Sequence, residues 1–201
     1  MIRTRTIALL GAGAFATGLL LGLAPSRAET TVQPASSAAY TVDPVHSSIA
    51  FRIRHNGVAN FYARFNEASG DFTLEDGGAV NVAVNTESVN TGNAKRDGHL
   101  KSPDFFNVKQ FPEITFKSTS LEKTGEDTFR LSGDLTMVGK NRQIQTELTK
   151  IGERETNQGN LAGFEIVLDI KRSDFDMTYG IENGALGDDV RLYISLEGRQ
   201  R

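Results

Sequence analysis

Residues 128–138 read TFRLSGDLTMV and carry the clearest strand pattern in the chain. Every second residue from Phe129 to Met137 is apolar or glycine, and the residues between them are polar. A period of two is typical of a β-strand with one buried face, because successive side chains point to opposite sides. A second alternating segment, residues 142–151, follows the turn Gly139-Lys140-Asn141. We therefore expect the two segments to form an antiparallel hairpin.

The same alternation extends in both directions from this hairpin, with the apolar residues of each segment on one face. The predicted strands are 47–55, 61–75 (with a bend at Gly70), 79–86, 113–121, 128–138, 142–151, 161–172 and 189–198. Short turn-forming segments separate several of them, so neighbouring strands are expected to be antiparallel. A two-sheet sandwich would satisfy the same pattern, but several segments run to roughly ten residues, which is longer than the usual sandwich strand. The sequence thus predicts an all-β fold, an antiparallel eight-stranded barrel.

Two segments interrupt the alternation. Residues 93–101 contain Ala, Lys, Arg and Leu and predict a short helix, and Ser102-Pro103 resembles the start of a further helical turn. Phe105 and Phe106 follow, so the helical segment near residues 93–106 is expected to place an apolar plug over one end of the barrel. Residues 174–188 form a long glycine-containing loop, a length that is often found in functional lids.

The N-terminal 28 residues have the pattern of an export signal. Arg3 and Arg5 precede an apolar run over residues 7–24, and Ser26 and Ala28 have the small-residue spacing that a signal peptidase recognises. The expected division is a signal peptide over residues 1–28, a flexible leader over 29–39 and the barrel domain over 40–201. An uncleaved membrane anchor is the alternative, because 18 apolar residues approach the lower limit for a span. Pro25 and the small residues after the run favour cleavage and no stable membrane anchor.

Composition excludes several classes of function. The chain has no cysteine, which rules out disulfides, thiol catalysis and cysteine-ligated metals. It has 25 acidic against 22 basic residues and no long basic run, so we expect no nucleic-acid partner. Asp43, His46 and Ser47 are the residue types of a hydrolase triad, but no Gly-x-Ser-x-Gly elbow is present. We therefore predict no catalytic residue.

Metal binding would require the fold to gather the histidines. His46, His55 and His99 are far apart in the sequence, and none has the His-x-x-x-His spacing of a helical site. No metal site and no cofactor are predicted on this basis.

The inward faces of the predicted barrel would form an apolar lumen. The residues expected to line it and contact a ligand are Phe51, Ile53, Val82, Phe116, Leu131, Gly133, Leu135, Thr146, Ile166, Leu168, Leu192 and Ile194. Gly133 and Thr146 are expected to leave space on otherwise apolar faces for one slender ligand. His46, Arg96 and His99 are candidates for contact with a polar head group. An Arg96–Asp97 pair that holds the short helix to the barrel is the structural alternative.

Several motifs resemble those of the YceI family. The opening segment from Tyr40 to Phe51, the central segments Arg96 to Ser102 and Asp104 to Val108, and Phe111 to Phe116 carry the resemblance. It extends from Tyr40 to about Leu196. The resemblance implies a lipocalin-like barrel, a periplasmic location, and binding of polyisoprenoids or similar long-chain amphiphiles; most members carry no enzymatic assignment.

We therefore predict an exported lipid-binding protein that holds an isoprenoid or another long-chain lipid for transport, storage or sequestration. Burial of an apolar chain supplies a driving force that needs no catalyst. Two alternatives remain open, namely a periplasmic enzyme that acts on a lipid in the same lumen and a ligand-free stress-response protein. The sequence is compatible with a homodimer.

Overall fold

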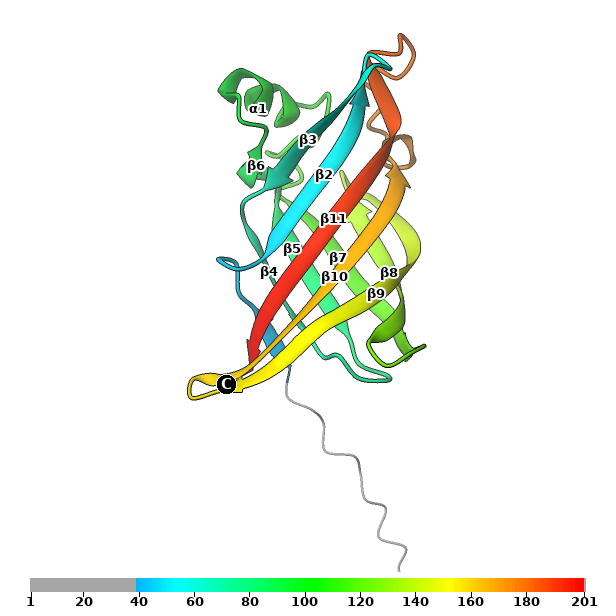
Figure 1. The fold of residues 1–201 in the computed structure, drawn as a ribbon. Helices are drawn as coiled ribbons and strands as arrows, with labels where there is room; N and C mark the ends of the chain where they lie inside the picture. The colour runs from blue at the N-terminus through cyan, green and yellow to red at the C-terminus, as the bar shows by residue number, and fades with distance from the viewer. Residues whose placement is uncertain (1–38, 201) are drawn as a thin grey trace, which may run out of the picture. The chain divides into compact units, whose positions relative to one another are not determined.

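The computed structural model describes residues 39–200, which form a closed antiparallel barrel with the short helix α1 at one end (Figure 1). The strands are β1 (Tyr40–Val42), β2 (Ser48–His55), β3 (Ala59–Phe65), β4 (Ala68–Phe72), β5 (Val80–Asn85), β6 (Val89–Asn90), β7 (Glu113–Lys123), β8 (Thr128–Met137), β9 (Lys140–Thr156), β10 (Gly159–Lys171) and β11 (Leu186–Gln200). The helices are α1 (Ala94–Leu100) and the 3-10 turns η1 (Thr86–Ser88) and η2 (Arg172–Phe175). The predicted signal peptide and nearly all of the predicted leader lie outside the described residues.

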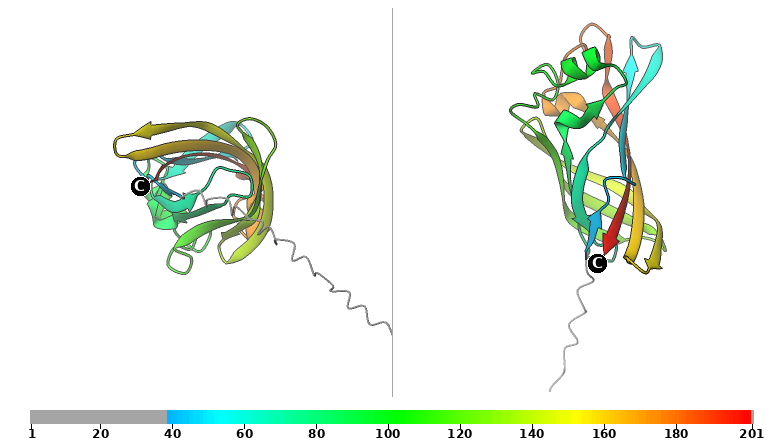
Figure 2. Two further views of the ribbon diagram at one scale, coloured as in Figure 1. Left: turned by 90° about the horizontal axis from the view of Figure 1, so that it is seen from below. Right: turned by 90° about the vertical axis from the view of Figure 1, so that its left-hand side faces the viewer.

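The barrel closes because the long strand β11 has two neighbours on the same side. Its C-terminal part pairs with β1 and its N-terminal part pairs with β2. The ring therefore runs β1, β4, β5, β7, β8, β9, β10, β11 and back to β1, and Figure 2 shows it from below. This confirms the predicted eight-stranded antiparallel barrel. β2, β3 and β6 extend the wall beyond β1 and β4 towards α1.

The strand predicted over residues 61–75 is in fact two strands, β3 and β4, and the break lies before the expected bend. The backbone N–H groups of Asn66 and Glu67 donate to the Ser88 hydroxyl, at 3.2 and 3.1 Å, so η1 interrupts the strand there. Gly70 has a different role: a Cβ at this position would lie 2.0 Å from the carbonyl oxygen of Asn81. The glycine permits the close approach of β4 to β5.

An aromatic layer fills the end of the barrel where β1 lies. Phe72 and Phe164 meet edge to face with ring centroids 4.9 Å apart, and Tyr40 stacks on Phe72 at 5.4 Å. Phe129 and Leu148 are cross-strand partners of β8 and β9 and are fully buried, as are Phe72 and Phe164. Since these side chains are large and interlocked, this end of the barrel is solid apolar core.

The opposite end is covered by α1, the segment after it and the loop over residues 176–185 (Figure 2). α1 begins where expected, because the Asn93 side chain accepts a hydrogen bond from the backbone N–H of Arg96. No second helical turn starts at Ser102; the amides of Phe105 and Asn107 donate to its carbonyl, and the chain folds back in successive turns. Phe105 and Phe106 are buried there, as the predicted plug requires.

Candidate ligand cavity

A cavity of about 400 Å³ lies inside the barrel. This volume is within the range of small-molecule sites, roughly 300–1,000 Å³. Eleven of the twelve residues predicted to face the lumen line it: Phe51, Ile53, Val82, Phe116, Leu131, Leu135, Thr146, Ile166, Leu168, Leu192 and Ile194. These residues belong to the apolar face of each predicted strand, and they line the cavity because alternate side chains of a strand point to the same side. Contact of these residues with a ligand stays a prediction.

Gly133 is the exception, and the space expected there is filled. A Cβ at Gly133 would lie 2.5 Å from Cζ of Phe116 and 2.6 Å from the carbonyl oxygen of Lys117. The ring of Phe116, on the neighbouring strand β7, therefore occupies the volume that the missing side chain leaves. Gly133 brings the two strands together and gives no room to a ligand.

Polar lining residues gather at the end of the cavity near α1. Thr146 lies on the wall, whereas His55, Arg96, His99, Arg172 and Tyr179 come from the end of β2, α1, η2 and the following loop. Among the residues that line the cavity there is no Asp or Glu. The cavity is thus apolar along its length and carries cationic groups at one end, which we call the mouth.

Arg96 is held at the mouth by an aromatic ring and a carbonyl. Its guanidinium lies over the ring of Phe61, 4.2 Å from the centroid, and Nη2 donates to the carbonyl oxygen of Thr91 at 2.8 Å. Among the described side chains Asp97 forms no ion pair with Arg96. Asp97 accepts hydrogen bonds from the hydroxyl and the amide of Thr91, and the hydroxyl bond is the main cause that lowers the pKa of its carboxyl. In place of the pair considered from the sequence, Arg96 and Asp97 bind Thr91 separately, through one hydrogen bond and two hydrogen bonds respectively.

His99 joins the three segments that cover the mouth. Its Nε2 lies 2.9 Å from Oδ2 of Asp104, and its ring meets Phe105 and Tyr179 edge to face at 5.1 and 4.9 Å. Phe105 and Tyr179 are also 5.2 Å apart. We call His99, Phe105 and Tyr179 the mouth cluster. It connects α1 and the plug to the loop over residues 176–185, which lies within the segment 174–188 that the sequence indicated as a lid.

Arg172 is a cavity residue that the sequence analysis missed. Only 3% of its surface is exposed, and its Nε, Nη1 and Nη2 donate to the carbonyls of Gly187, Met177 and Leu186 at 2.8, 2.8 and 3.3 Å. Burial lowers the pKa of the guanidinium and nearby Asp188 opposes this effect, but an arginine stays charged in proteins. The signal was available: Arg172 continues the inward parity of Phe164, Ile166, Leu168 and Ile170.

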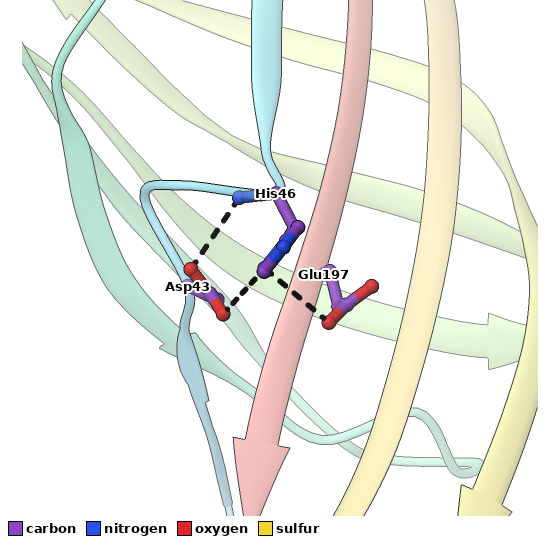
Figure 3. Close-up of side chains that lie close together, drawn as sticks. All are labelled: Asp43, His46 and Glu197. Atoms are coloured by element: carbon purple, nitrogen blue, oxygen red, sulfur yellow. Dashed lines mark hydrogen bonds and ion pairs between the residues drawn. The ribbon is translucent and has the colours of Figure 1, made fainter.

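His46 does not reach the cavity, which corrects its assignment to a head-group site. It lies in the turn between β1 and β2, exposed, beside Asp43 and Glu197 (Figure 3). Its Nδ1 is 2.9 Å from Oδ2 of Asp43 and 4.0 Å from Oε1 of Glu197. The Ser47 hydroxyl donates to the backbone carbonyl of Glu197, so a serine-histidine-aspartate relay is not formed here.

Asp43, His46 and Glu197 are the group of side chains within the described residues that could hold a metal ion. Their ligand atoms all lie within 4.8 Å of one another. The three histidines considered from the sequence are not brought together, since His46 is on the outer surface whereas His55 and His99 line the mouth. The ion pair of His46 with Asp43 accounts for the arrangement at the surface.

Within residues 39–200, none of the helices has the length and apolar character needed to cross a membrane. The fold and the cavity define a lipocalin-like antiparallel β-barrel with an apolar lumen. A family model described as a YceI-like domain matches residues 40–198, and the chain belongs to the YceI family.

Relatives and solved structures agree with this assignment. A UPF0312 protein of Yersinia pestis is 38% identical over 188 residues, which cover 90% of this chain and 96% of that protein. The crystal structure of the Campylobacter jejuni YceI protein superposes with a TM-score of 0.67 at 29% identity, covering 72% of this chain and 87% of the other. A polyisoprenoid-binding domain from Saccharophagus degradans, implicated in plant cell wall breakdown, has a TM-score of 0.67 at 21% identity over 82% of this chain and 99% of that chain. This last likeness shows the fold alone.

Proposed function

We propose that the protein binds one long-chain amphiphile of the isoprenoid type in the barrel cavity, without transforming it, and carries or stores it in the periplasm. The observation that carries the proposal is the apolar cavity of about 400 Å³ whose polar lining is concentrated at one end. A chain with one polar end matches such a cavity. The polyisoprenoid-binding domain with a similar fold adds support from a distant relative.

Burial of the chain would supply most of the binding energy. Each methylene-sized group removed from water contributes about 0.8 kcal/mol. The aromatic layer around Phe72 and Phe164 closes one end, so the tail would point there and the head group would lie at the mouth. Arg96 and His99 remain head-group candidates in this orientation, whereas His46 does not.

Binding is tested by filling the lumen. Leu168→Trp adds bulk inside the cavity, and Val167→Trp places the same side chain one residue away, where the native side chain is 51% exposed on the outer face. A fluorescent polyprenol should bind wild type and Val167→Trp equally and Leu168→Trp at least tenfold more weakly. If delipidated wild type binds nothing, or all three proteins bind alike, the cavity is not the ligand site.

The enzymatic alternative is tested with the same material. Incubation of the polyprenol with the protein, followed by mass analysis of the lipid, should return the lipid unchanged. A product formed in proportion to the amount of protein would replace the carrier proposal with an enzymatic one. Native mass spectrometry of freshly purified protein would report the bound lipid and the oligomeric state together.

Export is the part of the proposal that rests on sequence alone. The supporting pattern lies in residues 1–28, where positively charged residues are followed by an apolar run and then by small residues at the predicted cleavage site. Cells that express the full chain should contain a form in the periplasmic fraction that begins at or near Glu29. N-terminal sequencing that finds Met1 retained in a membrane fraction would contradict this.

A further inference from the structure

The charges at the mouth restrict the class of ligand. Arg96 and Arg172 come from different elements, α1 and η2, and both line the cavity. Two carboxylates lie nearby without lining the cavity: Asp97 accepts from Thr91, and Asp104 pairs with the mouth residue His99. The lining therefore has arginine side chains and no acidic side chain at the mouth, above an apolar interior.

Of the two arginines, Arg172 is the buried one, so its charge is the more costly to leave without an anionic partner. Its three described hydrogen bonds go to neutral carbonyls, and among the described residues it forms no ion pair with a carboxylate. Asp188 lies near it but accepts hydrogen bonds from the amide and hydroxyl of Ser173 and is 3.7 Å from the Lys171 ammonium. Carbonyl dipoles satisfy the donors of a guanidinium but carry no net charge, and the charge of Asp188 offsets only part of the cost of burying Arg172.

The guanidinium also keeps donors for a ligand. Arginine has five N–H groups in a planar fork, and three are used in the described bonds, which leaves one on each Nη atom. Planar forks of this kind recognise carboxylate and phosphate oxygens. We propose that the bound amphiphile has an anionic head group, a phosphate or a carboxylate, and that Arg172 together with Arg96 recognises it at the mouth.

This inference rests on the proposed function, which requires only an apolar chain in the cavity. A purely structural Arg172 would hold the loop after η2 through the same three carbonyls and would be indifferent to the ligand's charge. The two roles differ in one measurable quantity, the preference of the protein for a charged over a neutral ligand with the same chain.

The experiment compares head groups on a constant chain. Farnesyl monophosphate and farnesol form one pair, and oleate and oleyl alcohol form the second, so that phosphate and carboxylate recognition are separated; inorganic phosphate alone is the control without a chain. Wild type should bind the anionic member of at least one pair tenfold or more tightly than the neutral member. Inorganic phosphate should not bind measurably, because the chain supplies most of the affinity.

Variants assign the preference to residues. Arg96→Gln and Arg172→Gln should each reduce the anion-to-neutral ratio at least threefold and leave affinity for the neutral ligand within twofold. Lys95→Gln removes a neighbouring exposed charge of α1 that does not line the cavity, so it should leave the ratio unchanged. Circular dichroism checks folding, and Arg172→Met, which removes the charge and keeps an apolar stem, is the second variant at that position if Arg172→Gln does not fold.

The outcomes separate the two proposals. Equal binding of charged and neutral ligands by wild type would overturn the anionic head group and leave the carrier function standing. No binding of any of the four amphiphiles would overturn the carrier function itself. A preference that survives in both Arg96→Gln and a folded Arg172 variant would show that other groups recognise the anion and would overturn the assignment to these arginines.

Discussion

The hydroxyl of Ser47 binds both backbone polar groups of Glu197, a residue 150 positions later. It accepts from the Glu197 amide at 3.1 Å and donates to the Glu197 carbonyl at 3.3 Å. Glu197 is the point where β11 passes from its neighbour β2 to its neighbour β1. The serine therefore takes the place of a ladder partner at the position where the barrel closes.

Ser47→Ala should destabilise the protein by about 1–3 kcal/mol, because the Glu197 amide loses its hydrogen-bond partner at a half-buried site, whereas the Glu197 carbonyl keeps the bond from the Asp43 amide at 2.8 Å. Chemical denaturation measures the change. Ser48→Ala is the matched control: its side chain is exposed on β2, and its effect should stay within about 0.5 kcal/mol. Equal stabilities of the two variants would show that the Ser47 bonds do not matter for closure.

Gly133→Ala should cost about 1–3 kcal/mol, since the new methyl group would press on the Phe116 ring and on the Lys117 carbonyl. Gly152→Ala is the control, because a Cβ at Gly152 meets no atom within 4 Å. Thermal unfolding should show a lower midpoint for Gly133→Ala and an unchanged or higher midpoint for Gly152→Ala. A fully stable Gly133→Ala would mean that Phe116 moves aside freely.

The Asp43–His46 pair should make stability depend on pH in a defined window. The hydrogen bond between the two side chains is the main cause that raises the pKa of His46 above 6.5 and lowers the pKa of Asp43 below 3.8. The contribution of His46 is fully present below its unfolded pKa and is lost as pH rises through its raised folded pKa. The contribution of Asp43 is present above its unfolded pKa and is lost as pH falls through its lowered folded pKa. The pair therefore stabilises most between these two ordinary values.

A histidine NMR titration checks this directly. Asp43→Asn keeps an oxygen that can accept from the Val45 amide but removes the charge, so the pKa of His46 should fall towards 6.5. The difference in unfolding midpoint between wild type and Asp43→Asn should shrink from pH 5 to pH 8. An unchanged His46 titration in the variant would exclude Asp43 as the cause.

Tyr179→Ala should speed the release of a bound chain, because the tyrosine ring contacts both His99 and Phe105 across the mouth. One aromatic contact contributes about 0.5–1.5 kcal/mol, which corresponds to a dissociation rate increased roughly two- to tenfold. Stopped-flow displacement of a fluorescent polyprenol measures the rate. Tyr62→Ala removes another exposed tyrosine, on β3 and not among the cavity-lining residues, and should leave the rate unchanged. The same rate in both variants would show that the mouth cluster does not retain the ligand.

The sequence determined the long strands and the side of each that faces inward, but not the break between β3 and β4 or the short strands β1 and β6. This information is local, because a period of two places alternate side chains on opposite faces whatever the neighbouring strand is. Phe51, Leu131 and Leu192 could thus be assigned to the lumen without knowledge of their partners. The signal for the short helix α1 was also local, since the Asn93 side chain caps the helical turn that directly follows it. If the alternation of Ile166, Leu168 and Ile170 is continued by two residues, it places Arg172 on the inward face as well.

The tertiary structure decided what depends on register between strands that are distant in the sequence. The volume at Gly133 belongs to Phe116 because β7 and β8 pair with Ser118 opposite Gly133, and no pattern within either strand specifies that offset. His46 meets Glu197 because β11 changes neighbours there, 151 residues further along the chain. Alternation fixes a side chain's face within its own strand, but its neighbours follow only from closure of the ring, which all the strand pairings determine together.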